Sequence, residues 1–438
     1  YDVALVSIGG IVLCLGLISG IARRHPVPMP LIAVAIGILL GDRGFGVLDV
    51  SRWESQSFVV EEAARITLAI GLMGVALRLP PRYYIDKSRT AAVLLGPLMA
   101  GMWIVSGLIV FLLTNLPFWL AMLTGAVVTP TDPVVASTIV TGRVAEENLP
   151  AHVRDAISAE SGANDGLAYP FVVLGILLLT RSAGDALVHW AMRTVLWEVG
   201  VGVLAAAAVG YAAGRLLRWA KVHALVEETS LLASSIALSL VLLGAARLIG
   251  TNGILAVFAG GLAFAHLLDD EDRAHLHRAQ EAANRFFVLP VFVLFGASLP
   301  WDGWGSFGWR GLAIVAAILL FRRLPVAVAL QPLLGERFGP RETLFVGWFG
   351  PIGVGGIYYG AFAHNRTGDS APWVLASLIV CASLIAHGVS SVPLTRWYGG
   401  DVPNETPEGE RRLRGRAPGS TRGATDKGRS HRVAGHGR

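Results

Sequence analysis

The chain has 438 residues, of which 53% are hydrophobic and only 15% are charged, whereas about 25% of the residues in a soluble domain carry a charge. The formal net charge of +5 resides beyond residue 395, where ten Lys and Arg outnumber five Asp and Glu, so the rest of the chain is neutral. This composition excludes a soluble globular body, a nucleic-acid-binding body with a basic face, and intrinsic disorder outside the C-terminal tail. Cys14 and Cys381 both lie in apolar runs, which excludes a disulfide framework and a cysteine metal site.

About thirteen apolar runs follow one another along the chain, and most are long enough for a helix to cross about 30 Å of hydrocarbon. They predict an all-α polytopic membrane protein whose surroundings are the lipid bilayer. We expect a transmembrane domain over residues 1–394 and a basic, disordered tail over residues 395–438. Glycines at small-residue spacing, such as Gly200, Gly210 and Gly214, indicate closely packed helices. The predicted spans are 3–21, 27–41, 57–77, 91–113, 118–140, 156–180, 195–214, 229–249, 253–268, 286–300, 311–334, 342–363 and 372–392.

The distribution of Lys and Arg between the loops predicts how the chain is oriented. One set of alternating loops, together with the tail, holds 26 of these residues, and the other set holds 6. Because cytoplasmic loops are enriched in Lys and Arg, we expect the tail in the cytoplasm and the N-terminus outside a cell membrane. Arg23 and Arg24 follow the first run instead of preceding it, so this run is predicted to be a span and not a signal peptide.

The fifth run, within 118–140, is interrupted by polar residues. Pro130 and Pro133 flank the pair Thr131 and Asp132, and proline removes a backbone donor and clashes with the preceding helical turn. Backbone groups freed in this way are tolerated in a membrane only where they face protein or water, and there they can coordinate a cation. The sequence therefore predicts a broken helix with an ion site; a simple proline kink is the alternative.

The sixth run carries four polar residues within six positions: Glu160, Ser161, Asn164 and Asp165. At 100° per residue, Glu160 and Asp165 lie about 140° apart on a helix, so they do not share a proton. We expect Ser161 and Asp165 to face a cavity, and Glu160 and Asn164 to brace a neighbouring helix. A buried carboxylate holds either a proton or a hard cation such as Na⁺. A salt-bridged structural role is the alternative for Asp165 and the preferred interpretation for Glu160.

The twelfth run is interrupted as well. The segment GWFGPIGVGGIYYG at 347–360 includes Gly350, Pro351 and Gly353, and so many glycines disfavour an unbroken helix. Broken segments at corresponding places in two halves of a membrane protein are typical of an inverted-repeat transporter with a site near the midplane.

Three arginines within or beside spans are candidate ion-pair partners for a buried acid: Arg65, Arg322 and Arg323. Charges inside a span are costly and mark functional sites by default. A purely structural ion pair is an equally acceptable interpretation for each of them.

These motifs resemble the monovalent cation:proton antiporter superfamily in its sodium/proton exchanger (NhaP-like) branch, and among its members the fungal plasma-membrane Na⁺/H⁺ antiporters and their bacterial relatives. The segments that carry the resemblance are TDPVVAST, SAESGANDGLAYPF and FGPIGVGGIYY, with weaker matches at 68–84, 94–103 and 286–301. The resemblance extends to about residue 394. It implies a homodimer whose dimerisation and core subdomains are interleaved in sequence, with two broken helices that cross in the core.

The resemblance also implies roles for individual residues. Asp165 is the expected exchanging carboxylate, and Asn164 precedes it in an Asn-Asp pair. The residues expected near the ion are Thr131, Asp132, Glu160 and Ser161, with Asp165, Ser161 and Thr131 as Na⁺ ligands. Many members carry an Arg where this chain has Ile352. Glu160 therefore needs another partner, for which we consider Arg323, Arg322 and Arg65, or it is protonated.

The expected function is exchange of Na⁺, Li⁺ or K⁺ for H⁺ by alternating access, in the service of pH homeostasis, with no enzymatic activity and no cofactor. A K⁺/H⁺ antiporter is the nearest alternative. A cation channel and an intramembrane aspartyl protease using Asp132 and Asp165 are remote alternatives, the latter because a GxGD-type setting is missing.

Overall fold

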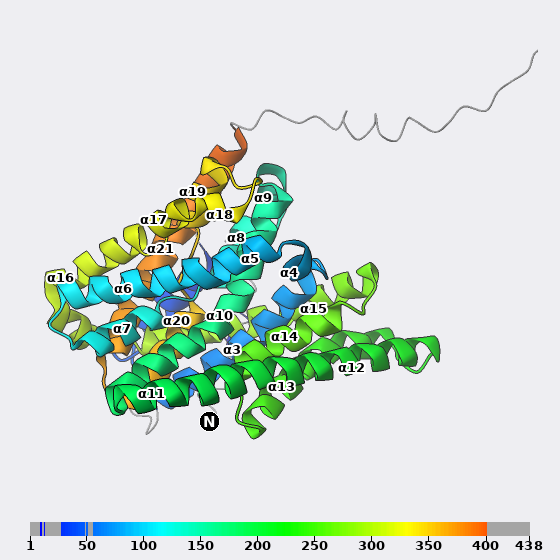
Figure 1. The fold of residues 1–438 in the computed structure, drawn as a ribbon, viewed down its shortest axis with the longest axis horizontal. Helices are drawn as coiled ribbons and strands as arrows, with labels where there is room; N and C mark the ends of the chain where they lie inside the picture. Colours follow the sequence, from blue (N-terminus) through cyan, green and yellow to red (C-terminus); the bar gives the residue numbers. More distant parts are fainter. Residues whose placement is uncertain (1–8, 11–12, 14–27, 49, 51–55, 401–438) are drawn as a thin grey trace, which may run out of the picture.

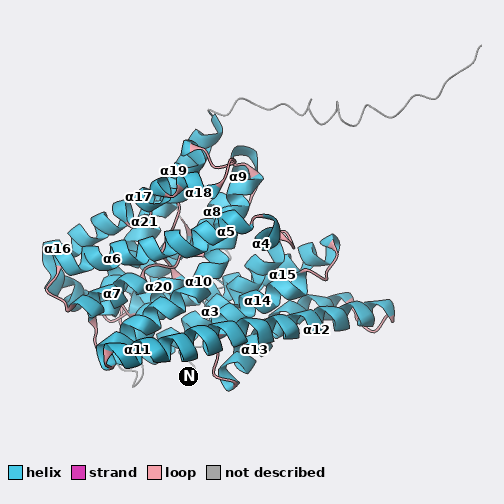
Figure 2. Ribbon diagram, viewed as in Figure 1, coloured by secondary structure: helices cyan, strands magenta, loops and turns pink. Residues whose placement is uncertain are grey.

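The computed structural model describes residues 9–10, 13, 28–48, 50 and 56–400, and all the regular structure in this part of the chain is helical (Figures 1 and 2). The predicted all-α architecture is therefore confirmed. The first predicted span falls almost wholly outside the described residues, as do Cys14, Arg23 and the tail beyond residue 400.

Each of the twelve predicted spans from 27–41 onward coincides with a helix or with adjoining helical segments. The first half contains α2 (Met29–Leu40), α3 (Gln56–Arg78), α4 (Tyr83–Asp86), α5 (Ser88–Val93), the π-helix η2 (Leu94–Leu98), α6 (Met99–Leu113), α7 (Phe118–Val127), α8 (Pro133–Val140), α9 (Arg143–Asn148) and α10 (Ala151–Thr180). The second half contains α11 (Ala183–His189), the π-helix η3 (Trp190–Val201), α12 (Gly202–Val222), α13 (Glu228–Leu248), α14 (Gly253–Ala265), α15 (Asp270–Ala297), α16 (Trp301–Phe321), α17 (Leu324–Ala329), α18 (Gln331–Leu334), α19 (Pro340–Trp348), α20 (Val354–Thr367) and α21 (Ala371–Gly400).

Five helical stretches among the described residues are long and apolar enough to cross a membrane by themselves. They are Ser88–Leu113, Ala151–Thr180, Ala183–Val222, Trp301–Ala329 and Ala371–Gly400. The shorter apolar helices include α2, α7 and α14, and α7 is the first half of an interrupted span.

Helix α15 extends well before the predicted span 286–300, and the acidic residues 270–272 form its first turn. Asp269 is the N-cap and accepts a hydrogen bond from the Asp272 backbone N–H at 2.8 Å. Acidic side chains in a first turn also interact favourably with the positive end of the helix dipole. Similarly, α21 continues to Gly400, past the expected start of the tail at residue 395.

The helices pack in two groups. Helices α2, α3 and α12–α15 contact one another, and α5–α10 together with α16–α21 form the second group. In Figure 1, α12 and α13 lie along one edge, α6 and α16 lie at the opposite side, and α3, α10 and α20 occupy the middle. Helix α3 joins the groups, since it contacts α14 and α15 in the first group and α20 in the second.

Close approach within the first group depends on glycine, as the small-residue spacing predicted. A Cβ at Gly210 of α12 would overlap the carbonyl of Gly260 on α14, and one at Gly214 would lie 2.9 Å from Leu267. Gly200 serves no comparable interhelical contact, because a Cβ there would meet only the Val195 carbonyl of its own helical segment.

Replacing Gly210 by Ala should lower the free energy of unfolding by about 1–3 kcal/mol, because the added methyl group forces α12 and α14 apart. The matched control is Gly244→Ala on α13, where a Cβ meets nothing within 4 Å and helix propensity alone favours Ala by up to about 1 kcal/mol. Thermal unfolding of both variants in detergent would contradict the packing argument if Gly210→Ala were as stable as Gly244→Ala.

Candidate functional site

Two broken helices meet at the centre of the second group. Residues 128–132 separate α7 from α8, and residues 349–353 separate α19 from α20. The two breaks contact each other directly, since the Asp132 N–H donates to the Pro351 carbonyl at 2.7 Å. The predicted interruptions at Pro130–Pro133 and at Gly350–Gly353 are therefore real breaks, and the simple proline kink is excluded.

A single carboxylate caps both half-helices that begin at the breaks. Asp132 Oδ1 accepts hydrogen bonds from the N–H groups of Val134 at 2.6 Å and Val135 at 3.1 Å, in the first turn of α8. Its Oδ2 accepts from the N–H of Val354, the first residue of α20, at 2.5 Å. Each helix N-terminus carries a partial positive charge and unpaired N–H groups, so one buried anion stabilises two of them.

A single guanidinium binds the two half-helices that end at the breaks. Arg322 donates to the carbonyls of Val128 and Thr129, just beyond α7, and to the carbonyl of Gly350, just beyond α19. Helix C-termini carry partial negative charge and unpaired carbonyls. Arg322 is thus the counterpart of Asp132, and of the three arginines considered as partners of Glu160 it is not the one that binds it.

Glu160 is paired with the adjacent arginine. The two guanidinium ends of Arg323 donate to the two carboxylate oxygens of Glu160, the Nη2–Oε2 contact being 2.6 Å, and Nε donates to the Val346 carbonyl at 2.9 Å. The side chains of Arg323 and Glu160 are 4% and 2% exposed, respectively, so water screens or solvates these two charges very little. Ile352, at the position where the resemblance would have placed an Arg, is fully buried.

Arg65 lies elsewhere. It forms an ion pair at 2.6 Å with Glu62, one turn earlier on α3, and the carboxylate of Glu62 also accepts from Arg247 of α13 at 3.0 Å. Arg65, the third arginine considered for Glu160, is therefore not its partner.

Asn164 connects α10 to the unwound stretch between α7 and α8. Its Nδ2 donates to Thr131 Oγ1 at 2.7 Å, and its Oδ1 accepts from the Thr131 N–H at 3.2 Å. Ser161, one turn earlier, donates its hydroxyl to the Ser158 carbonyl of its own helix at 3.3 Å. Both hydroxyl oxygens retain lone pairs that could coordinate a cation.

Asp165 differs from the other buried acids because its carboxylate has no partner. Its side chain is fully buried, and neither oxygen accepts a hydrogen bond from the described part of the chain. Its backbone carbonyl, in contrast, accepts from the Tyr359 hydroxyl of α20. An isolated buried carboxylate is unfavourable by several kcal/mol or more unless it binds a proton or a cation. The site can therefore hold one or the other.

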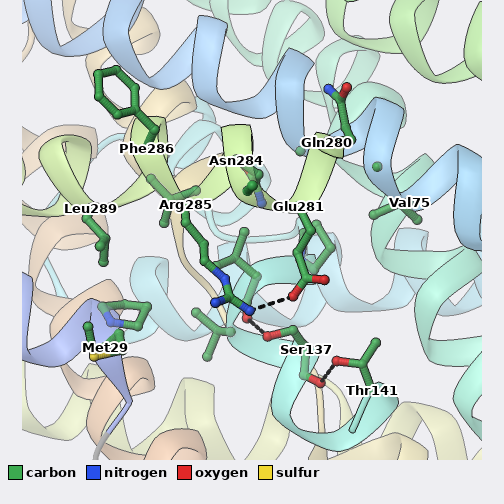
Figure 3. Close-up of a pocket in the computed structure, with 18 of the residues that line it drawn as sticks. Met29, Val75, Ser137, Thr141, Gln280, Glu281, Asn284, Arg285, Phe286 and Leu289 are labelled. Carbon is green, nitrogen blue, oxygen red and sulfur yellow. Dashed lines mark hydrogen bonds and ion pairs between the residues drawn. The ribbon is translucent and has the colours of Figure 1, made fainter. Parts of the chain in front are cut away.

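A cavity of about 550 Å³ lies beside the first turn of α8 (Figure 3). Helices α2, α3, α8 and α15 line it, and Figure 3 shows Glu281 and Arg285 of α15 facing Ser137 across it. Glu281 and Arg285 form an ion pair at 2.8 Å. The lining includes Pro133 and Val134, next to the Asp132 cap, but not Asp165. No motif in the sequence pointed to this cavity, whose walls come from four separate segments.

Among the described residues, no group of three or more His, Cys, Asp or Glu side chains could hold a resident metal ion. Any cation bound near Asp165 would be coordinated by one carboxylate together with hydroxyl, amide and backbone oxygens, the ligands that hard monovalent cations accept.

Comparison with known proteins gives consistent results. A family model described as "Sodium/hydrogen exchanger, transmembrane" matches residues 10–397. "Na(+)/H(+) antiporter 2" of Zygosaccharomyces rouxii is 29% identical over 82% of the chain, which spans only 48% of that relative's length. "K(+)/H(+) antiporter NhaP2" of Shewanella sp. (strain ANA-3) is 24% identical over 88% of the chain and 65% of its own length. The solved structure of the sodium proton antiporter MjNhaP1 from Methanocaldococcus jannaschii has the same fold, with a TM-score of 0.69, 20% identity and coverage of 90% of this chain and 98% of that one.

Removing one member of the Glu160–Arg323 pair should lower the free energy of unfolding by about 3–5 kcal/mol, because the remaining charge stays buried without a partner. Glu160→Gln and Arg323→Met test this separately by thermal unfolding in detergent. The double variant should recover much of the loss, since it removes both charges. Arg65→Met is the control, with an expected cost of about 1 kcal/mol or less; an equal cost for Arg65→Met and Arg323→Met would refute the assignment.

Proposed function

Since the chain belongs to the sodium/hydrogen exchanger family, we propose that it exchanges Na⁺ for H⁺ across the cell membrane by alternating access, with Asp165 as the exchanging carboxylate. The family consists of transporters, so the chain is not an enzyme. The observation that carries the proposal is the Asp165 carboxylate, which is fully buried beside the crossing of two broken helices and has no hydrogen-bond partner among the described residues.

The exchange follows from charge. Asp132 and Arg322 have opposite charges and are held by helix ends, and Glu160 and Arg323 neutralise each other. Asp165 has no such balance, so the site crosses the membrane with little electrostatic cost only when it carries H⁺ or a monovalent cation. Because the same carboxylate binds both, binding of one requires release of the other.

The oxygens that would surround the cation come from two segments, α10 and the break between α7 and α8. We propose that Asp165 binds it directly and that the Thr131 and Ser161 hydroxyls complete the site. Asn164 holds Thr131 in place through two hydrogen bonds and thereby positions the unwound backbone at 128–132. Asp132 contributes to the electrostatics of the site and keeps both half-helices in register.

In this scheme we propose that the structure represents an inward-facing state, in which the cavity approaches the Asp132 cap but does not reach Asp165. The cavity of about 550 Å³ lies at the end of α3 that precedes an Arg-rich loop, the side that the positive-inside rule assigns to the cytoplasm. At the opposite end, α3 and α20 are joined by hydrogen bonds from Asn365 Nδ2 to Glu61 at 2.6 Å and from Ser57 to Asn365 Oδ1 at 2.5 Å. We propose that these bonds close the external side and break during transport.

Na⁺ is favoured over K⁺ as the cargo because the relative from Zygosaccharomyces rouxii, named as an Na(+)/H(+) antiporter, is more similar to this chain than the one named as a K(+)/H(+) antiporter. The aspartyl protease alternative is disfavoured by geometry. Asp132 accepts three backbone hydrogen bonds, so it is not arranged to share a catalytic water with Asp165.

We also propose that the protein forms a homodimer in the membrane. Support comes from the segment Ala183–Val222, in whose most apolar stretch only 17% of the residues are buried. Its exposed residues include Leu196, Leu204, Leu216 and Trp219, an apolar surface suited to a second copy or to lipid.

Asp165→Asn should abolish Na⁺-dependent proton movement in proteoliposomes, because an amide holds neither the exchanged proton nor a cation of comparable affinity. The measurement is the fluorescence of a pH-sensitive dye after addition of Na⁺, Li⁺ or K⁺. Glu62→Gln, in the external ion-pair cluster with Arg65 and Arg247, is the control and should retain exchange. Near-normal exchange by Asp165→Asn would refute the proposed role.

Alternating access predicts that linking α3 to α20 stops transport. In a background with Cys14 and Cys381 replaced by Ser, Glu61→Cys and Asn365→Cys should react with a short, reducible bifunctional thiol reagent, and exchange should then fall at least tenfold and recover after cleavage of the linker. The matched control is Glu62→Cys with Arg247→Cys, which links α3 to α13 within one packed group. Full exchange in the linked 61–365 protein would show that this contact does not open.

A further inference from the structure

Three glycines at the start of α20, namely the N-cap Gly353 and the first-turn residues Gly355 and Gly356, face three different surroundings. A Cβ at Gly353 would overlap Asp132 Oδ2, and a Cβ at Gly355 would overlap Asp165 Oδ1. A Cβ at Gly356 would instead meet apolar methyl groups, those of Ile352 at 2.8 Å and Val380 at 3.0 Å. Of the three, Gly355 lies against the unpartnered carboxylate.

Backbone conformation does not explain a glycine at position 355. Its φ is not positive, unlike that of Gly368 at the end of the same helix, so an alanine could adopt the same backbone conformation. Glycine inside a helix is also less favourable than alanine by about 1 kcal/mol. The remaining reason for glycine is the close approach of the Asp165 carboxylate, since a Cβ at this position would overlap Asp165 Oδ1.

Three elements meet at this contact and would form the walls of the place where a cation binds to Asp165. The backbone of α20 at Gly355 forms one wall and the carboxylate of Asp165 on α10 forms the second. Pro130 in the break between α7 and α8 forms the third, since its Cβ lies 3.2 Å from the position that a Cβ on Gly355 would take. A cation bound to Asp165 Oδ1 would therefore lie beside the bare backbone at Gly355 and beside Pro130.

We propose that Gly355 is a specificity-determining residue, which makes the site wide enough for Na⁺ and larger monovalent cations. The inference rests on the proposed function, since it concerns the ion that Asp165 exchanges for protons. With the same oxygen ligands, cavity size and the rigidity of the ligands decide between ions of equal charge. A methyl group at this position narrows the site or displaces the carboxylate, and either change penalises a large cation more than a small one.

Gly355→Ala should lower the ratio of K⁺ to Li⁺ exchange, measured as kcat/KM in proteoliposomes, by roughly tenfold, with the Na⁺ value between the two. Gly356→Ala is the matched control. It adds the same methyl group in the same helical turn and gains the same helix propensity, but it faces Ile352 and Val380, so the ratio should remain as in the unmodified protein.

Pro130→Gly provides a test of opposite sign. It removes the side chain that faces Gly355, so it should raise the ratio of K⁺ to Li⁺ exchange. If Gly355→Ala failed to fold, as judged by size-exclusion chromatography and thermal unfolding, Pro130→Gly would decide the question alone. An unchanged ratio in the folded Gly355→Ala protein, or equal changes in Gly355→Ala and Gly356→Ala, would overturn the inference. If the unmodified protein exchanged none of the three cations for protons, the proposed function itself would fail.

Discussion

Two helices broken inside a membrane protein leave unpaired N–H and carbonyl groups where water is scarce, and the structure around them depends on how those groups are satisfied. Here Asp132 binds the N-termini of α8 and α20, and Arg322 binds the carbonyls that follow α7 and α19. One anion and one cation thus stabilise four helix ends. Without both, the breaks would leave unsatisfied polar groups at a cost of several kcal/mol each.

This arrangement separates structural charges from the exchangeable one. Beside Asp132 and Arg322, the pair of Glu160 and Arg323 is also buried and neutral as a whole. Asp165 is then the buried acid near the breaks that is left without a partner in the described part of the chain. Asp165 can exchange a proton for a cation because the charges around it are already paired with one another. Their interactions stay the same whichever of the two ions Asp165 binds.

The helix breaks and the buried acids could be predicted from the sequence, because prolines, clustered glycines and carboxylates inside apolar runs each conflict with an unbroken lipid-facing helix. The sequence was not sufficient for the arginines. Arg322 and Arg323 are adjacent and equally buried, and their different partners lie on α10, on α19 and in the breaks after α7 and α19, so sequence position alone does not tell them apart. Gly355 was likewise inconspicuous, because nothing in a glycine-rich segment tells which glycine faces a carboxylate. The first turns of α15 lay outside the predicted span 286–300, because acidic residues are typical of solvated loops as well as of first helical turns.

The adjacency of Arg322 and Arg323 has a consequence for how the chain assembles in the membrane. When α7 and α10 have been synthesised, the carbonyls of Val128 and Thr129 and the carboxylate of Glu160 still lack the guanidinium groups that they bind in the finished protein. Both groups arrive together at the end of α16, more than a hundred residues later in the chain. The N-terminal half therefore cannot reach its final packing alone, and its insertion must leave a route by which α16 can dock late. Final packing also needs the Gly350 carbonyl and the Val354 N–H, which follow Arg323 in the chain, so assembly of this core is a joint event of both halves.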